Sequence, residues 1–174
     1  MRLHRSLAPL FSFLFILCAS TVFGQNADQT YKVVVPQSIA ITSPSAVQLT
    51  HDQTDNKQVF PAQAWVVRGN NRNGVDVKLE VATPFVHTQD SSFKVDAEMA
   101  LSIASTQGAA TWSVTKPTDK TNVANNDNDA FVTATSNGVG RANLSLSVTF
   151  AAKEWGTYAS GEYVTTVVGT VTAK

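Results

Sequence analysis

Apolar and polar residues alternate one by one along several segments of this chain. In residues 75–81 and 144–150 every second residue is apolar and the residues between are polar or charged. Successive side chains of a strand point to opposite faces of a sheet, so this pattern buries one face and leaves the other in water. No amphipathic stretch of helical period exceeds about two turns, so the strands have no crossover helices and must pair mainly antiparallel. The alternation therefore predicts an all-β fold.

Other segments have strand composition between turn-forming residues. Residues 93–103 include helix formers around Ala97 and Leu101, but their apolar residues keep the period of two, which favours a strand. The remaining candidates are residues 31–35, 38–41, 47–50, 64–68, 110–115, 130–135 and 163–172. The sequence therefore predicts about nine or ten strands.

Two Asn-Gly pairs, at residues 73–74 and 137–138, lie between strand candidates. Both residue types accept the positive φ of a tight turn, so each pair predicts a hairpin. Antiparallel strands with one buried face are expected to pack as two sheets, in an immunoglobulin-like or pilin-like β-sandwich. A closed β-barrel is the alternative, because closure also removes exposed sheet edges.

The amino terminus has the composition of a secretory signal peptide. Arg2 and Arg5 precede an apolar run over residues 10–19, and Gly24 is a small residue ahead of polar sequence. The run is about ten residues long, too short to cross a bilayer as a helix. We therefore expect a signal peptide over residues 1–24, a flexible leader over 25–30 and a single β-sandwich domain over 31–174.

Charge and cysteine content narrow the function classes. Removal of Arg2 and Arg5 reduces 13 basic residues to 11 against 13 acidic ones, and no Lys/Arg cluster is present. Nucleic-acid binding needs a basic surface, so we expect no nucleic-acid partner. The single cysteine, Cys18, lies in the signal peptide, and a disulfide-free exported domain favours a bacterial protein. No later segment is apolar enough to span a membrane, so we expect a secreted or cell-surface location.

The C-terminal segment reads GEYVTTVVGTVT over residues 161–172. This Gly-x-Tyr turn with Val/Thr alternation resembles the closing strand of secreted bacterial β-sandwich families, the spore coat U and pilin-like subunits and the WxL surface domains. The resemblance implies export and a part in surface assembly, adhesion or cell-wall association. The chain departs from the WxL pattern at two positions, with Val114 in place of leucine and Gly169 in place of the second tryptophan.

Three aromatic residues near the C-terminus are candidate ligand-binding residues. Trp155, Tyr158 and Tyr163 are spread around two glycines and would form a platform for stacking sugar rings at the tip of the sandwich. The alternative is that they close the end of the core. Trp65 and Trp112 lie beside valines within strand candidates, and we assign both to the core.

The most polar stretch, residues 122–129, contains candidate metal ligands. Asn125, Asp127 and Asp129 offer the hard oxygen atoms that Ca²⁺ prefers. The stretch lacks the Gly and the distal Glu of an EF-hand loop, and the alternative is a solvated turn in which Asn and Asp bond to their own backbone. Apart from Ca²⁺ at this loop, we expect no cofactor.

No combination of residues predicts catalysis. Two Ser-x-x-Lys tetrads, at residues 91–94 and 113–116, fall on or beside strands, where side chains three apart lie on opposite faces. His51 and His87 have no converging partners in the sequence, and we interpret both as solvated loop histidines. We therefore expect no enzyme activity.

These observations predict an exported structural or adhesive cell-surface protein that acts through binding or assembly. Its expected partners are other surface or wall proteins, or further copies of itself joined by strand addition. The alternative is a carbohydrate or cell-wall binding module built on the three aromatic residues.

Overall fold

The computed structural model describes residues 24–152 and 154–174. They belong to two units, Met1–Val34 and Val35–Lys174, and every strand lies in the second unit. Of the expected signal peptide only Gly24 is among the described residues. Within those residues no helix is long or apolar enough to cross a membrane.

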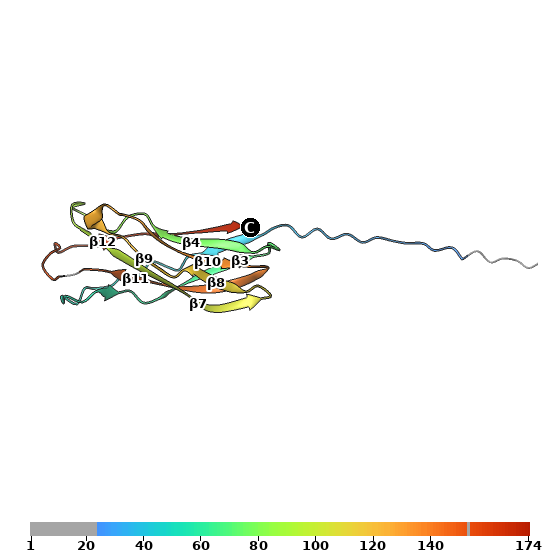
Figure 1. Cartoon of the computed structure of the whole chain (residues 1–174), viewed down its shortest axis with the longest axis horizontal. Coiled ribbons are helices and arrows are strands. Elements are labelled where there is room, and N and C mark those ends of the chain that lie inside the picture. The colour runs from blue at the N-terminus through green and yellow to red at the C-terminus, as the bar shows by residue number, and fades with distance from the viewer. Residues whose placement is uncertain (1–23, 153) are drawn as a thin grey trace, which may run out of the picture. The chain divides into compact units, whose positions relative to one another are not determined.

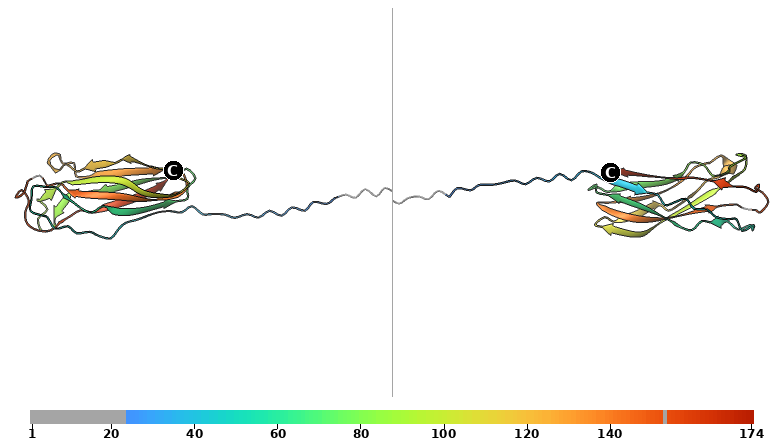
Figure 2. Two further views of the ribbon diagram at one scale, coloured as in Figure 1. Left: turned by 90° about the horizontal axis from the view of Figure 1, so that it is seen from below. Right: turned by 180° about the vertical axis from the view of Figure 1, so that it is seen from behind.

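The strands form antiparallel sheets that pack as a β-sandwich and do not close into a barrel (Figures 1 and 2). Sheet A has the order β1 (Ile39–Thr42), β3 (Gln63–Gly69), β11 (Gly140–Phe150), β7 (Ala97–Gly108) and β9 (Thr118–Lys120), and β2 (Gln58–Val59) also pairs with β11. Sheet B has the order β13 (Val167–Ala173), β4 (Val75–Val81), β10 (Ala130–Ser136) and β8 (Trp112–Lys116). Sheet C is a small sheet of β12 (Tyr163–Val164), β5 (Phe85–His87) and β6 (Lys94–Val95).

The hydrophobic core lies between the inner faces of sheets A and B. In β4 and β11 the predicted alternation is confirmed, because Leu79, Leu144 and Leu146 are buried while the residues between them are exposed or half-buried. Trp65 of β3 and Trp112 of β8 are also buried, as predicted for core tryptophans. The period of two therefore locates the core face of the long strands.

Gly169 in β13 makes room for the largest core side chain. A Cβ at this position would lie 2.5 Å from Cζ3 of Trp65 and 2.9 Å from Cδ1 of Ile41. Its backbone φ is not in the left-handed region, so the requirement for glycine is one of space and not of conformation. Trp65 crosses from sheet A and packs directly on the backbone of sheet B.

The two predicted Asn-Gly hairpins are wrong. The segment through Gly74 joins β3 to β4, and residues 137–139 join β10 to β11; in both cases the two strands belong to different sheets. A type I′ turn needs positive φ at both central residues, but Gly74 has a φ of 92° while Asn73 does not have a positive φ. The Gly74 N–H donates to the carbonyl of Asn71 at 3.1 Å, which closes a turn that carries the chain across the sandwich.

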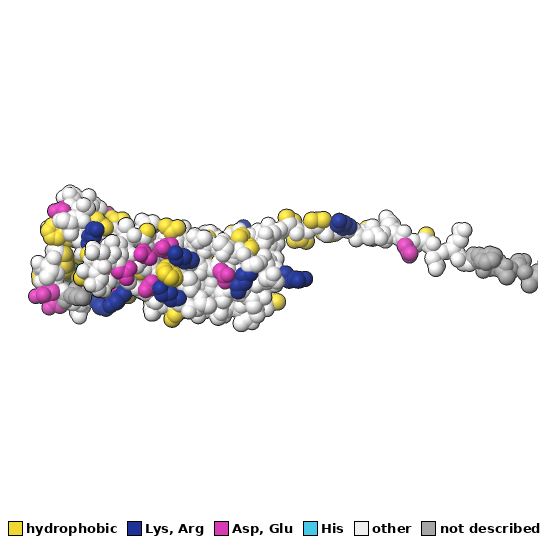
Figure 3. Space-filling model, turned by 45° about the horizontal axis from the view of Figure 1, so that its top comes forward, with side chains coloured by type: hydrophobic (Ala, Val, Ile, Leu, Met, Phe, Trp, Pro, Cys, Tyr) yellow, Lys and Arg dark blue, Asp and Glu magenta, His cyan; other side chains and the backbone are white. Residues whose placement is uncertain are grey.

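Several strand boundaries also differ from the prediction. Residues 31–35 and 47–50 form no strand, although their composition favours one, because no strand lies beside them to complete the backbone hydrogen bonds. Figure 3 shows uncovered apolar side chains along the extended segment that includes residues 31–34. Residues 93–103 are divided at Asp96, where the chain leaves sheet C for sheet A. Residues 163–172 are divided in the same way between β12 and β13.

We predict that Leu146→Ala destabilises the domain by about 2–5 kcal/mol, because it removes a buried side chain from the centre of β11. Ser147→Ala, one residue along on the opposite face, should change the free energy of unfolding by less than about 0.5 kcal/mol. Denaturant unfolding of the two variants measures both values. If Ser147→Ala destabilised the domain more than Leu146→Ala, the register assigned to β11 would be wrong by one residue.

We predict that Gly169→Ala costs about 1–3 kcal/mol, because the added methyl group overlaps the indole ring of Trp65. The matched control is Thr170→Ala on the exposed face of the same strand, which should have little effect. In a Trp65→Leu background the cost of Gly169→Ala should shrink, since the ring it meets is gone. Equal costs in both backgrounds, measured by thermal and denaturant unfolding, would contradict this packing.

Candidate functional site

Two loops meet at the end of the sandwich where β11 finishes at Phe150. One is the loop between β1 and β2, which contains His51, and the other is the loop between β11 and β12, which contains Trp155 and Tyr158. The C-terminus lies at the opposite end of the domain (Figure 1). We call residues 51–58 together with Trp155, Tyr158 and Tyr163 the aromatic end.

The structure brings the three predicted aromatic residues together. The ring centroids of Trp155 and Tyr158 are 5.8 Å apart, and those of Tyr158 and Tyr163 are 6.4 Å apart. Tyr158 and Tyr163 are half-buried and pack on Phe150 edge to face, whereas Trp155 remains 50% exposed. The two tyrosines therefore extend the core outward, and the tryptophan ring remains accessible at the surface.

His51 lies beneath this group, and sequence reasoning missed its part in it. Its ring is 5.7 Å from that of Trp155 at an interplanar angle of 31°, and 5.2 Å from that of Tyr158. The interpretation of His51 as a solvated loop residue is wrong, because only 20% of its side chain is exposed. No local pattern signals this contact, since His51 and Tyr158 are 107 residues apart.

The hydrogen bonds of His51 determine where its proton lies. Nδ1 accepts the backbone N–H of Gln53 at 2.9 Å, so in the neutral ring Nε2 carries the hydrogen and donates it to the Tyr158 hydroxyl at 2.6 Å. Nδ1 also lies 3.8 Å from the carboxylate of Asp52. The Tyr158 hydroxyl oxygen then accepts this bond, and its own hydrogen remains available for a further one.

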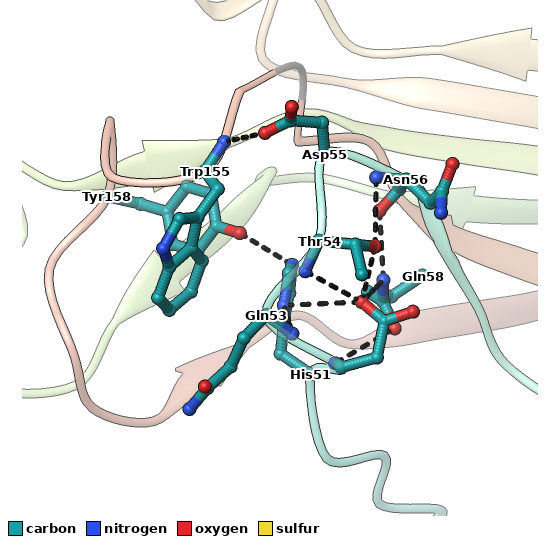
Figure 4. A network of polar contacts seen from close by, with 9 residues as sticks. His51, Gln53, Thr54, Asp55, Asn56, Gln58, Trp155 and Tyr158 are labelled. Carbon is teal, nitrogen blue, oxygen red and sulfur yellow. Dashed lines mark hydrogen bonds and ion pairs between the residues drawn. The ribbon is translucent and has the colours of Figure 1, made fainter.

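Asp52 organises the rest of the loop, where Thr54 and Gln58 turn toward each other (Figure 4). Its Oδ1 accepts hydrogen bonds from the backbone and hydroxyl groups of Thr54, at 3.0 and 2.7 Å, and from the amide of Gln58 at 2.7 Å. The bond from the Thr54 hydroxyl is the main reason that the pKa of Asp52 lies below its usual value. Gln53 is held at a φ of 61°, a conformation that non-glycine residues rarely adopt and that often marks functional loops.

Asp55 fixes Trp155 from the other loop. Its Oδ1 accepts the backbone N–H of Trp155 at 2.7 Å, which joins two loops 100 residues apart (Figure 4). The indole is therefore positioned at its backbone by Asp55 and at its ring by His51. A half-exposed tryptophan held in this way loses little conformational freedom when it binds a ligand.

His87 supports the aromatic end from sheet C, and its interpretation as a solvated residue is also wrong. It is 5% exposed, Nδ1 accepts the N–H groups of Gln89 and Asp90, and Nε2 donates to the carbonyl of Ser160 at 3.2 Å. Gly161, with a φ of 148°, presses against this ring so closely that a Cβ would overlap Nε2. The sequence does carry a signal for this burial, because His87 lies two residues after Phe85 in β5 and both side chains are buried.

The candidate calcium loop has a different structure. Asn125 ends a short 3₁₀ helix, Val123–Asn125, and the backbone of Asp127 pairs with that of Asn122 to close the turn. Asn125, Asp127 and Asp129 are exposed. Within residues 24–152 and 154–174 no group of three or more His, Cys, Asp or Glu side chains could hold a metal ion.

Shallow hollows occur away from the aromatic end. One on sheet A is lined by Ser105, Thr106, Gln107, Arg141 and Asn143, and another by Val35, Gln37, Asn70, Asn71, Arg72 and Val139. Neither gathers aromatic rings or carboxylates.

Comparison of the chain with protein-family models, with curated proteins and with solved structures found no match. The geometry of the aromatic end is therefore the basis for a functional proposal.

We predict that Tyr158→Phe makes the stability of the domain less sensitive to alkaline pH. Burial, followed by the charges of Asp52 and Asp55, raises the pKa of the Tyr158 hydroxyl. The folded state thus holds this proton more tightly than the unfolded state, so the stabilisation is complete below the unfolded pKa of about 10 and is lost as the pH rises through the folded pKa. Denaturant unfolding at pH values on both sides of about 10 should show a steeper loss for the wild type than for the variant. Identical slopes would contradict the prediction.

Proposed function

We propose that this chain is an exported adhesive protein that binds carbohydrate at its aromatic end and performs no catalysis. The observation that carries the proposal is the half-exposed indole of Trp155, fixed by the Asp55 carboxylate at its backbone and by His51 at its ring. Sugar rings present a flat patch of C–H groups on one side and hydroxyl groups around the rim. An exposed indole suits the first, and nearby polar groups suit the second.

The polar groups beside Trp155 match the needs of sugar hydroxyls. Among the described residues no hydrogen bond reaches Oδ2 of Asp52 or Oδ2 of Asp55, so both oxygens can accept from a hydroxyl. Tyr158 can donate, because its hydroxyl oxygen already accepts from His51. Donor and acceptor groups at the same end as an exposed indole distinguish this end of the domain from a simple core plug.

The charge of this end favours some sugars over others. The carboxylates of Asp52 and Asp55 act on the Tyr158 hydroxyl and help to raise its pKa, so we expect neutral or amino sugars to bind better at this end than acidic ones. Asp52 is poorly suited to act as a general acid in hydrolysis. A glycosidase needs a general acid with a raised pKa, whereas the hydrogen bonds of Thr54 lower the pKa of Asp52.

The test is binding of the purified protein to arrayed glycans and isolated cell-wall polysaccharides. We expect Trp155→Ala to weaken binding about 10- to 100-fold, a loss of about 1.4 to 2.8 kcal/mol. Trp155→Phe, which retains a smaller ring, should lose less. The control is Val168→Ala, which truncates a side chain of similar exposure on sheet B and should leave binding unchanged. Binding that survives Trp155→Ala, or no glycan bound by the wild type, would refute the proposal.

A further inference from the structure

Two arginines lie directly opposite each other on the outer face of sheet A. Arg68 of β3 is paired with Arg141 of β11 in the strand register, and both side chains are exposed. They point away from the core, because the adjacent residues Val67 and Ala142 are buried. Residues directly opposite on antiparallel strands have their Cβ atoms about 5 Å apart, and like charges placed there repel each other. The two guanidinium groups therefore place two positive charges at one point of the sheet.

No acidic residue neutralises this pair within the described part of the chain. None of the ion pairs found there includes Arg68 or Arg141. The acidic residues in the strands of sheet A are Glu98 and Asp119, which lie along the first half of β7 and are each paired with a lysine. Arg141 lies beside the opposite end of β7, at Gln107. The repulsion between the two arginines would be relieved by an anion that binds both of them.

A polar hollow with a volume of about 320 Å³ lies beside Arg141. Apart from this arginine, its lining consists of uncharged hydroxyl and amide side chains: Ser105, Thr106, Gln107 and Asn143. A β-bulge lies next to it, because the register between β7 and β11 shifts after Asn143 and leaves Ala104 as an extra residue in β7. Bulges redirect side chains and are common beside binding sites. The hollow thus joins one positive charge to several groups that can bond to hydroxyls.

Two polar groups of the hollow have unused bonding capacity. Nδ2 of Asn143 donates to Oγ of Ser105 at 2.9 Å, so the Ser105 hydroxyl keeps its own hydrogen for another acceptor. Oδ1 of Asn143 is buried and has no hydrogen-bond partner among the described residues. A buried acceptor without a partner costs free energy, and a water molecule or a ligand hydroxyl can supply the missing bond. The hollow therefore offers both a donor and an acceptor to a polar ligand.

We propose that Arg68 and Arg141 bind the carboxylate or sulfate group of an acidic polysaccharide, with sugar hydroxyls in the hollow beside Arg141. A guanidinium group forms two parallel hydrogen bonds to such an oxyanion, and two of them side by side select for negative charge. Two arginines are too few for nucleic acid or an anionic membrane, because both are bound through many cationic groups. This site lies away from the aromatic end and does not depend on the carbohydrate binding proposed there.

The test is calorimetric titration of the purified protein with short oligosaccharides prepared from polygalacturonate, dextran sulfate and uncharged dextran, and with phosphatidylglycerol vesicles. Arg68→Gln and Arg141→Gln each remove one guanidinium group, and Arg141→Lys keeps the charge but loses the planar fork. Both arginines are exposed, so the variants should remain folded. The matched control is Lys94→Gln, which removes an exposed positive charge from sheet C. Trp155→Ala separates this site from the aromatic end.

We expect the wild type to bind at least one acidic oligosaccharide more tightly than dextran, and the one it binds identifies the oxyanion. Arg68→Gln and Arg141→Gln should each weaken that binding about 10-fold or more, because charge-assisted hydrogen bonds are lost. Arg141→Lys should lose less, and Lys94→Gln and Trp155→Ala should bind as the wild type does. Binding of neither acidic oligosaccharide, binding of the vesicles alone, or an equal loss in Lys94→Gln or Trp155→Ala would overturn the proposal.

Discussion

The burial of sheet A against sheet B is the interaction on which the rest of this domain depends. Neither sheet is made from a continuous piece of the chain: β3 and β4, β7 and β8, and β10 and β11 are neighbours in sequence that lie in opposite sheets. The chain therefore passes from one sheet to the other at each of these connections, and the two sheets share one core. The contact of Trp65 with Gly169 shows this packing most directly, because the Trp65 side chain of sheet A fills the space beside Gly169, which has no side chain, in sheet B. With no cysteine after Cys18, this burial is also what holds the domain together.

The long strands could be predicted from the sequence because their signal is local. A period of two is visible in β4 and β11 without knowledge of what they pair with, and the buried phase follows from it. Which strands pair with each other is not decided by local sequence, and the wrong predictions concern that pairing. Asn73 and Asn137 mark turns correctly, but whether a turn closes a hairpin or crosses the sandwich depends on which sheet the next strand joins. The predicted strand over residues 47–50 is wrong for the same reason, because composition favours a strand but does not determine whether another strand lies beside it. β2, with two residues, is too short to show any period.

The aromatic end was predictable in part. Trp155, Tyr158 and Tyr163 are close in sequence, so their proximity in space needed no tertiary information. His51 and Asp55 come from a loop about a hundred residues earlier, and only the fold brings them to Tyr158 and Trp155. Without them the three rings would be an apolar patch. With them, Asp55 holds the backbone of Trp155 and His51 is hydrogen-bonded to the Tyr158 hydroxyl.

The geometry of the domain separates the aromatic end from the opposite end of sheet A. β3 and β11 are antiparallel, with Gly69 opposite Gly140, so Asn70 lies at one end of sheet A while Phe150 and the aromatic end lie at the other. The second half of β7 pairs with the first half of β11, near Gly140 and not near Phe150. Under the carbohydrate proposal, a ligand at Trp155 would therefore leave that half of sheet A uncovered.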